Sequence, residues 1–149
     1  MKLLKIITPE LPHLKKLDGK FWQLTSDYNV DLVTDEGTLS YCMYSGWITD
    51  LRSGSSVIDV IVPKKGNKLY DASILCHDFN YSGHVTKNIA DDLLRQGMIM
   101  SGLSSWRARL AYIAVQAFGN GGYYNIDDAM PEPYSNNRCF EKFTWEAHV

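Results

Sequence analysis

The feature that most constrains the fold is a change in the spacing of apolar residues close to residue 66. Before it, apolar, aromatic and β-branched residues alternate with polar ones, as in "KFWQLTSDYNVDLV" at residues 20–33. A period of two is typical of β-strands. After it, apolar residues recur every three or four positions, as in "SSWRARLAYIAVQAFG" at residues 104–119, which is typical of helices. The sequence therefore predicts an α+β fold, with a small antiparallel β-sheet packed against a three-helix C-terminal unit.

Turn residues divide the first part of the chain into strands. Ser26–Asp27 and Asp35–Gly37 are predicted turns. Strands are expected at about residues 20–25, 29–34, 38–50 and 57–63, although the last of these segments could instead form a short helix. The length favours one domain, residues 1–149, with a sheet-rich part at about 18–64, a helical part at about 68–119 and an irregular packed tail at about 120–149.

Three segments of the second part are predicted helices, at residues 69–83, 88–102 and 104–119. Asn88 is the predicted N-cap of the second helix, which places Asp91 and Asp92 in its first turn, where acidic residues stabilise a helix. In the third helix, Leu110, Ile113 and Phe118 lie on one stripe. We expect this stripe to face the core.

Composition excludes several classes of protein. Apolar residues make up 45% and charged residues 21% of the 149 residues, as in a soluble globular protein. The formal net charge of −2 argues against a nucleic-acid binder. Three widely spaced cysteines, without a Cys-x-x-Cys motif, predict no disulfide framework and favour a reducing compartment. We also expect no signal peptide and no membrane span, because no apolar run reaches the roughly 20 residues that a span needs.

A His-Asp doublet, His77–Asp78, stands out within the apolar run "ILCHDFNYSG". On a helix, the two side chains diverge by about 100° and can do different work. A helical hairpin would bring Asp91 or Asp92 back toward the doublet, so we predict that one ring nitrogen of His77 is hydrogen-bonded to Asp91 and that the other faces a solvent-reachable cleft. His77 and Asp91 are therefore the candidate catalytic residues, with His77 as a general base.

A purely structural interpretation stays open. A carboxylate in a first helical turn stabilises the helix by roughly 0.5–1 kcal/mol without any catalysis. A buried histidine bonded to a carboxylate can also be a structural tie. The spacing alone favours this interpretation slightly.

Several blocks of the sequence occur in an order that resembles a known family. In order along the chain, they are Gly46–Trp47, Thr49–Asp50, Ser53, His77–Asp78 with Phe79 or Tyr81, Ala90–Asp91, and Tyr112–Gly119. This outline resembles the phage and bacterial family known as domain of unknown function 1353, over roughly residues 20–122. The resemblance implies a fold and a phage origin rather than an activity. Among the matched blocks, Ser53, Tyr81 and Trp47 are the candidate substrate-binding residues.

A narrower resemblance concerns "CHDFNY" at residues 76–81, which looks like the His-Asp-x-x-Tyr helix of secreted phospholipases A2. By this resemblance, His77 is the base for a water molecule, Asp91 orients it, and Asp78 is a Ca²⁺ ligand with Asp50 as a further ligand from a loop. Carboxylates suit hard cations, so Ca²⁺ or Mg²⁺ is the expected metal if one binds at Asp50 and Asp78. The flanking disulfides and the glycine-rich calcium loop of those enzymes are not present in this sequence.

Two functions are consistent with these features of the sequence. The first is a phage-encoded hydrolase that activates water for attack on an ester or another acyl or phosphoryl substrate. The second is a non-enzymatic phage module, either a virion component or a binder of a host or anti-defence factor, in which the His-Asp motif is structural. Other virion proteins or a host protein are the expected partners, and the host cytoplasm or the virion is the expected location.

Overall fold

The computed structural model describes residues 1–8, 10–50, 67–118 and 122–148, except for the side chain of Phe118. Its elements in this part are β1 (Leu3–Ile7), β2 (Leu14–Lys16), β3 (Trp22–Leu24), β4 (Tyr28–Thr34), β5 (Gly37–Met43), β6 (Ile48–Thr49), α2 (Lys68–Asn80), α3 (Lys87–Met100), α4 (Ser105–Phe118), the 3₁₀ helix η2 (Tyr134–Phe140) and β7 (Glu141–Ala147). The strands form two antiparallel sheets, in the order β1-β4-β5-β7 and β2-β3-β6. The predicted α+β class, with helices following the sheet, is confirmed.

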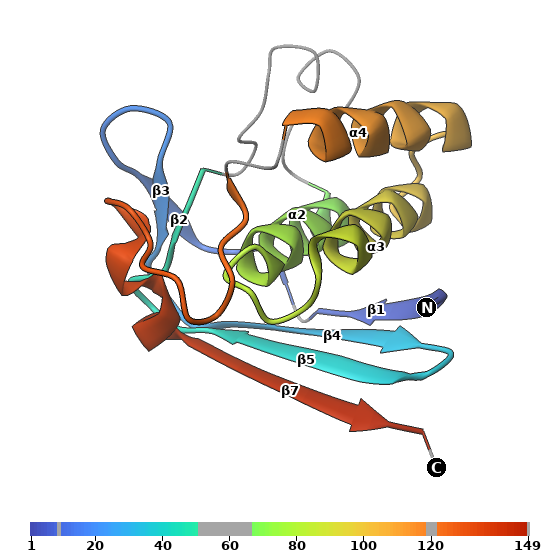
Figure 1. Ribbon diagram of the computed structural model, residues 1–149, viewed down its shortest axis with the longest axis horizontal. Helices are drawn as coiled ribbons and strands as arrows, with labels where there is room; N and C mark the ends of the chain where they lie inside the picture. The colour runs from blue at the N-terminus through green and yellow to red at the C-terminus, as the bar shows by residue number, and fades with distance from the viewer. Residues whose placement is uncertain (9, 51–66, 119–121, 149) are drawn as a thin grey trace.

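The larger sheet buries one face because its central strands alternate as predicted. Every second residue of β4 and β5 is buried, and cross-strand neighbours such as Val30 and Tyr41 point to the same side. Helix α2 contributes Leu75 and Phe79 to this core. Figure 1 shows α2 and α3 above the sheet and α4 on their far side, so that the helices add two layers to the sheet.

The helices α2 and α3 form the predicted hairpin. Asn67 caps α2 by accepting hydrogen bonds from the backbone of Leu69 and Tyr70. Gly97 allows α3 to approach α2 closely, because a Cβ atom at this position would lie 2.8 Å from the Cβ atom of Ser73. The expected cap of α3 is wrong: Thr86, not Asn88, is the N-cap residue, so Asp91 lies beyond the first turn. Asp91 is thus not in the position where the helix dipole by itself favours an acidic residue.

The orientation of α4 differs from the prediction. Leu110 and Ile113 are 41% and 50% exposed, whereas the buried positions of the helix are Ala108, Ala111, Ala114 and Val115. Small side chains allow close helix packing, and here they lie against Tyr70, Ile74, Leu94 and Met98 of α2 and α3. Residue size was therefore a misleading guide to which stripe faces inward. The third member of the predicted stripe is Phe118, whose side chain is not among those that the structure describes.

Three strands lie outside the predicted sheet-rich region. β1 and β2 precede residue 18, and β7 occupies part of the tail that was expected to be irregular. β7 pairs with β5, from Gly37–Ala147 to Met43–Glu141. This pairing joins segments about a hundred positions apart, so no local pattern announces it. The predicted strand or helix at Val57–Pro63 lies outside the described residues.

Candidate functional site

The hairpin brings His77 and Asp91 into direct contact. His77 lies near the end of α2 and Asp91 in the second turn of α3, and His77 Nε2 is 2.7 Å from Asp91 Oδ1. Both residues are buried, with residue exposures of 8% and 0%. The predicted hydrogen bond across the helical hairpin is therefore confirmed. It connects two residues that are 14 positions apart in the sequence.

Asp91 is held by four side chains rather than by His77 alone. The hydroxyl of Tyr81 donates to Oδ1 at 2.6 Å, and Lys87 Nζ donates to Oδ2 at 2.8 Å. Gln116 of α4 also donates to Oδ2. Lys87 Nζ donates in addition to the backbone oxygen of Val115 at 3.1 Å. The carboxylate thus joins α2, the start of α3 and the end of α4, and its orientation is fixed from three directions.

These donors keep Asp91 ionised. Burial raises the pKa of its carboxyl group, but the hydrogen bonds from His77, Lys87 and Tyr81 outweigh this effect and hold the pKa below its usual value. The ionised carboxylate of Asp91 accepts a hydrogen bond from Nε2–H of His77. In neutral His77, the proton then resides on Nε2, and Nδ1 carries the free lone pair.

The other ring nitrogen of His77 faces a second carboxylate. His77 Nδ1 lies 3.9 Å from Asp78 Oδ1, and Thr49 donates its hydroxyl hydrogen bond to Asp78 Oδ2. Asp50, which follows β6, lies close enough to Asp78 for the two carboxyl groups to interact. The side chain of Asp50 is only 6% exposed. The structure therefore brings Asp50 and Asp78 together beside the His77–Asp91 pair.

The position of Asp78 beside Asp50 disfavours the charged form of Asp78. Burial raises the pKa of Asp78, and repulsion by Asp50 raises it further, so that the pKa lies well above its usual range. Tyr134 Oη donates to Asp50 Oδ2 at 2.9 Å, and Lys20 Nζ lies 3.9 Å from the same oxygen. Burial, followed by Asp50 and Asp78, also raises the pKa of Tyr134. Two carboxyl groups in such a place either share a proton or have their charge compensated by a cation.

Asp50 and Asp78 do not belong to a larger cluster of metal-ligating side chains among the described residues. Across residues 1–8, 10–50, 67–118 and 122–148, no three His, Cys, Asp or Glu side chains are grouped so that they could hold a metal ion. Ca²⁺ takes roughly six to eight oxygen ligands, so an ion at Asp50 and Asp78 would need other oxygen atoms as well. Hydroxyl, backbone and water oxygens all suit it.

The three candidate substrate-binding residues differ in where the structure places them. Tyr81 donates a hydrogen bond from its hydroxyl group to Asp91 and therefore positions the carboxylate. Trp47 is 0% exposed and donates from Nε1 to Glu141, so its ring belongs to the core. As placed, it offers no surface to a substrate. Ser53 lies outside the described residues.

Sequence reasoning missed several neighbours of the site. Lys87 could have been found, because it precedes Asp91 by four positions on one helix and such pairs face each other. Thr49 directly precedes Asp50, but nothing in the sequence indicates its bond to Asp78. Gln116 and Tyr134 reach the site from α4 and η2 only through the tertiary fold.

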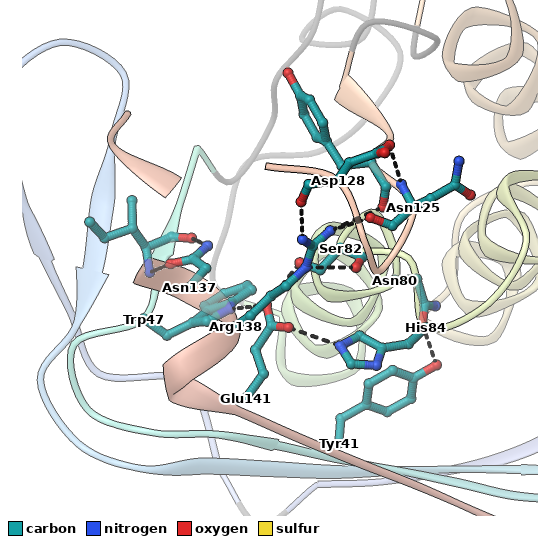
Figure 2. A network of polar contacts seen from close by, with 12 residues as sticks. Tyr41, Trp47, Asn80, Ser82, His84, Asn125, Asp128, Asn137, Arg138 and Glu141 are labelled. Atoms are coloured by element: carbon teal, nitrogen blue, oxygen red, sulfur yellow. Dashed lines mark hydrogen bonds and ion pairs between the residues drawn. The ribbon is translucent and has the colours of Figure 1, made fainter. Parts of the chain in front are cut away.

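A second histidine–carboxylate pair, which joins the partly buried His84 to the buried carboxylate of Glu141, lies outside this site (Figure 2). His84 Nε2 is 3.0 Å from Glu141 Oε2, while Glu141 Oε1 accepts hydrogen bonds from Trp47 Nε1 at 2.8 Å and from Ser82 Oγ at 2.9 Å. The Ser82 hydroxyl bonds to the carboxylate and not to the histidine, so this is not the arrangement of a serine nucleophile with its base. The network connects β7 to the turn between α2 and α3.

Arg138 of η2 strengthens the same connection. Its guanidinium donates to the backbone oxygens of Ser82 at 3.1 Å and Asn125 at 2.6 Å, and also to that of Asp128. Figure 2 shows Arg138 reaching from the C-terminal segment toward these oxygens. These bonds add to the links that hold the C-terminal segment against the turn between α2 and α3.

Fold and site together define an α+β protein whose helical hairpin carries an oriented histidine next to paired carboxyl groups. A family model described as "Protein of unknown function (DUF1353)" matches residues 22–115. The match covers more than half of the chain, and the chain belongs to this family. The searches of curated proteins and of solved structures gave no match. In the part of the chain that the structure describes, no helix has the length and apolar character needed to cross a membrane.

Proposed function

We propose that this protein is a hydrolase in which His77 is the general base. The main support for this proposal is the contact between His77 Nε2 and Asp91 Oδ1 at 2.7 Å. Asp91 is held in turn by hydrogen bonds from Tyr81, Lys87 and Gln116. This arrangement fixes the ring and its tautomer and leaves Nδ1 as a base.

In the proposed reaction, His77 Nδ1 removes a proton from a water molecule. The resulting hydroxide attacks the carbonyl or phosphoryl centre of an ester, and the bond to the leaving group breaks. His77 then returns the proton to the leaving oxygen. Asp91 stays ionised throughout and stabilises the transient imidazolium. Tyr81, Lys87 and Gln116 are positioning residues that act through Asp91.

Asp50 and Asp78 are the proposed ligands of a hard divalent cation, Ca²⁺ or Mg²⁺. A bound cation would supply positive charge that polarises the substrate oxygen. Support comes from the proximity of Asp50 to the buried Asp78, whose pKa is raised by burial and by the charge of Asp50, an effect that a cation would relieve. The local resemblance of residues 76–81 to the phospholipase A2 helix gives the same assignment for Asp78 and the same roles for His77 and Asp91. A phage origin stays a prediction of the family resemblance, and the proposed chemistry does not depend on it.

Hydrolysis of 4-nitrophenyl acyl esters and of bis(4-nitrophenyl) phosphate tests the proposal, with Ca²⁺, Mg²⁺ or a chelator present. We expect nitrophenolate release by the wild type with at least one probe class. His77→Gln should lower kcat/KM by about 100-fold or more, as for the loss of a general base. Asp91→Asn should lower it by about 10-fold or more through loss of ring orientation.

His84→Gln is the matched control, because it removes the other histidine–carboxylate contact, which is partly buried. This variant should keep kcat/KM and lower the melting temperature. Equal activity of the wild type and His77→Gln would contradict the proposal. An absence of turnover with every probe, together with a large loss of stability in His77→Gln, would favour the alternative, a non-enzymatic module. The existence of the structural His84–Glu141 pair in the same chain is the observation that favours this alternative.

A further inference from the structure

The outward face of α4 is apolar. Trp106, Leu110 and Ile113 are 62%, 41% and 50% exposed, and their spacing of four and three positions places them on one stripe. The opposite face holds the buried Ala108 and Ala111. Among the described side chains, the helix therefore buries Ala108 and Ala111 and exposes three larger apolar residues, which is the reverse of an ordinary surface helix.

Positive charge borders this stripe. Arg107 and Arg109 are exposed and lie on either side of Trp106, Leu110 and Ile113, and no acidic residue occurs between Ser105 and Phe118. The guanidinium of Arg107 lies over the Trp106 ring, 5.3 Å from its centroid. The protein as a whole has a formal net charge of −2, so the charge of this helix is a local feature.

A second copy of the chain is a poor fit for this surface. Three side chains of one helix fall well short of the roughly 800 Å² that each partner buries in a stable protein–protein interface. Packing the stripe against its own copy would also bring together two helices that each carry two arginines and no acidic residue. Their repulsion would oppose association.

An anionic lipid surface fits both properties. Interfacial helices insert tryptophan and aliphatic side chains at the level of the lipid head groups, and arginines at their borders contact lipid phosphates. The planar guanidinium binds phosphate through paired hydrogen bonds. We propose that α4 docks the protein on the surface of a membrane that contains anionic lipids, through Trp106, Leu110 and Ile113 with Arg107 and Arg109. This inference goes beyond the proposed hydrolase and does not require it.

Co-sedimentation of the full chain with sucrose-loaded vesicles tests the proposal. We expect binding to phosphatidylcholine vesicles that contain phosphatidylserine, with weaker binding to pure phosphatidylcholine and at high salt. Arg107→Gln with Arg109→Gln should weaken binding to the anionic vesicles by about tenfold or more, since each basic residue near such a surface contributes about 1 kcal/mol. Trp106→Ala with Ile113→Ala should weaken binding to both kinds of vesicle by about tenfold or more.

Trp145→Ala is the matched control. Trp145 is also 43% exposed, but it belongs to β7, on the side of the molecule away from α4 (Figure 1), and its removal should leave binding unchanged. The arginine variant keeps the test valid even if the apolar double variant folds poorly. The proposal is overturned if the wild type does not bind anionic vesicles, or if both double variants bind as the wild type does. A concentration-dependent dimer that Trp106→Ala abolishes would overturn it in favour of a second copy.

Discussion

At the residue scale, the buried carboxylate of Asp91 is the centre of a hydrogen-bond network. Asp91 receives hydrogen bonds from a histidine, a tyrosine, a lysine and a glutamine. An ion pair at a protein surface contributes little, but removing one member of a buried network leaves its partners without compensation. Asp91 is therefore expected to matter for stability whatever the site does.

The first stability prediction concerns Asp91→Asn. The substitution should lower the free energy of unfolding by about 1–3 kcal/mol at pH 7, because it leaves the partly buried Lys87 without its anionic partner. The pKa of Asp91 is lowered in the folded state, so its stabilising effect is present above the ordinary carboxyl pKa of about 3.9 and is lost as the pH falls through the folded pKa.

Denaturant unfolding of both proteins at pH values from about 2 to about 8 checks this prediction, because carboxyl groups titrate within this range. The difference between wild type and Asp91→Asn should shrink below a pH of about 4. Asp92→Asn is the control, because the side chain of Asp92 is 39% exposed and its bonds to Arg95 and Gln96 are only partly buried. A difference that stays constant over the whole pH range would show that Asp91 is not ionised in the folded protein.

At the element scale, the site depends on how closely α2 and α3 approach. Gly97 lies inside α3, where alanine would ordinarily be the better helix former by roughly 0.5–1 kcal/mol. Its place against Ser73 explains why it interrupts an otherwise helical pattern. The same close approach sets the distance between His77 and Asp91, which lie nearer the turn that connects the two helices.

Gly97→Ala is therefore expected to destabilise the protein, against the helix propensity. The added methyl group would meet Ser73, and overpacking of this kind costs about 1–3 kcal/mol. Asn88→Ala in the same helix is the comparison, since Asn88 is exposed and only propensity changes there. Thermal melts of the two variants give the sign. An increase in melting temperature for Gly97→Ala would show that the helices are further apart than described.

At the scale of the whole molecule, Glu141 joins parts of the chain that are distant in sequence. Its carboxylate, with a side-chain exposure of only 1%, contacts Trp47 after β5, Ser82 and His84 in the helical turn, and itself begins β7. Glu141 is thus one of the residues whose hydrogen bonds join the sheet to the hairpin.

Glu141→Ala should lower the free energy of unfolding by about 1–3 kcal/mol or more, because Trp47 Nε1 would lose its acceptor inside the core. Amide hydrogen exchange should also accelerate in β7, which relies on β5 and this network for its position. Glu146→Ala in the same strand is the control, since Glu146 is exposed. Unchanged exchange in β7 with an unchanged melt would mean that strand pairing alone holds the C-terminal segment.

The sequence by itself determined the features that depend on neighbours along the chain. Alternation over residues 28–43 specified two paired strands, and the helical periods specified α2, α3 and α4. The hairpin geometry of two helices with a short turn was enough to predict that His77 meets Asp91. These predictions succeeded because side-chain direction within a helix or strand is fixed by the local backbone.

Only the tertiary structure decided which distant residues meet. The pairing of β7 with β5, the burial of Trp47 against Glu141 and the contacts of Gln116 and Tyr134 with the two carboxyl groups of the site join segments with no common local pattern. The face that α4 buries was decided in the same way, because α2 and α3 leave room for Ala108 and Ala111 rather than for Leu110. Packing selects the side chains that fit the space between elements, and that space exists only once the elements have assembled.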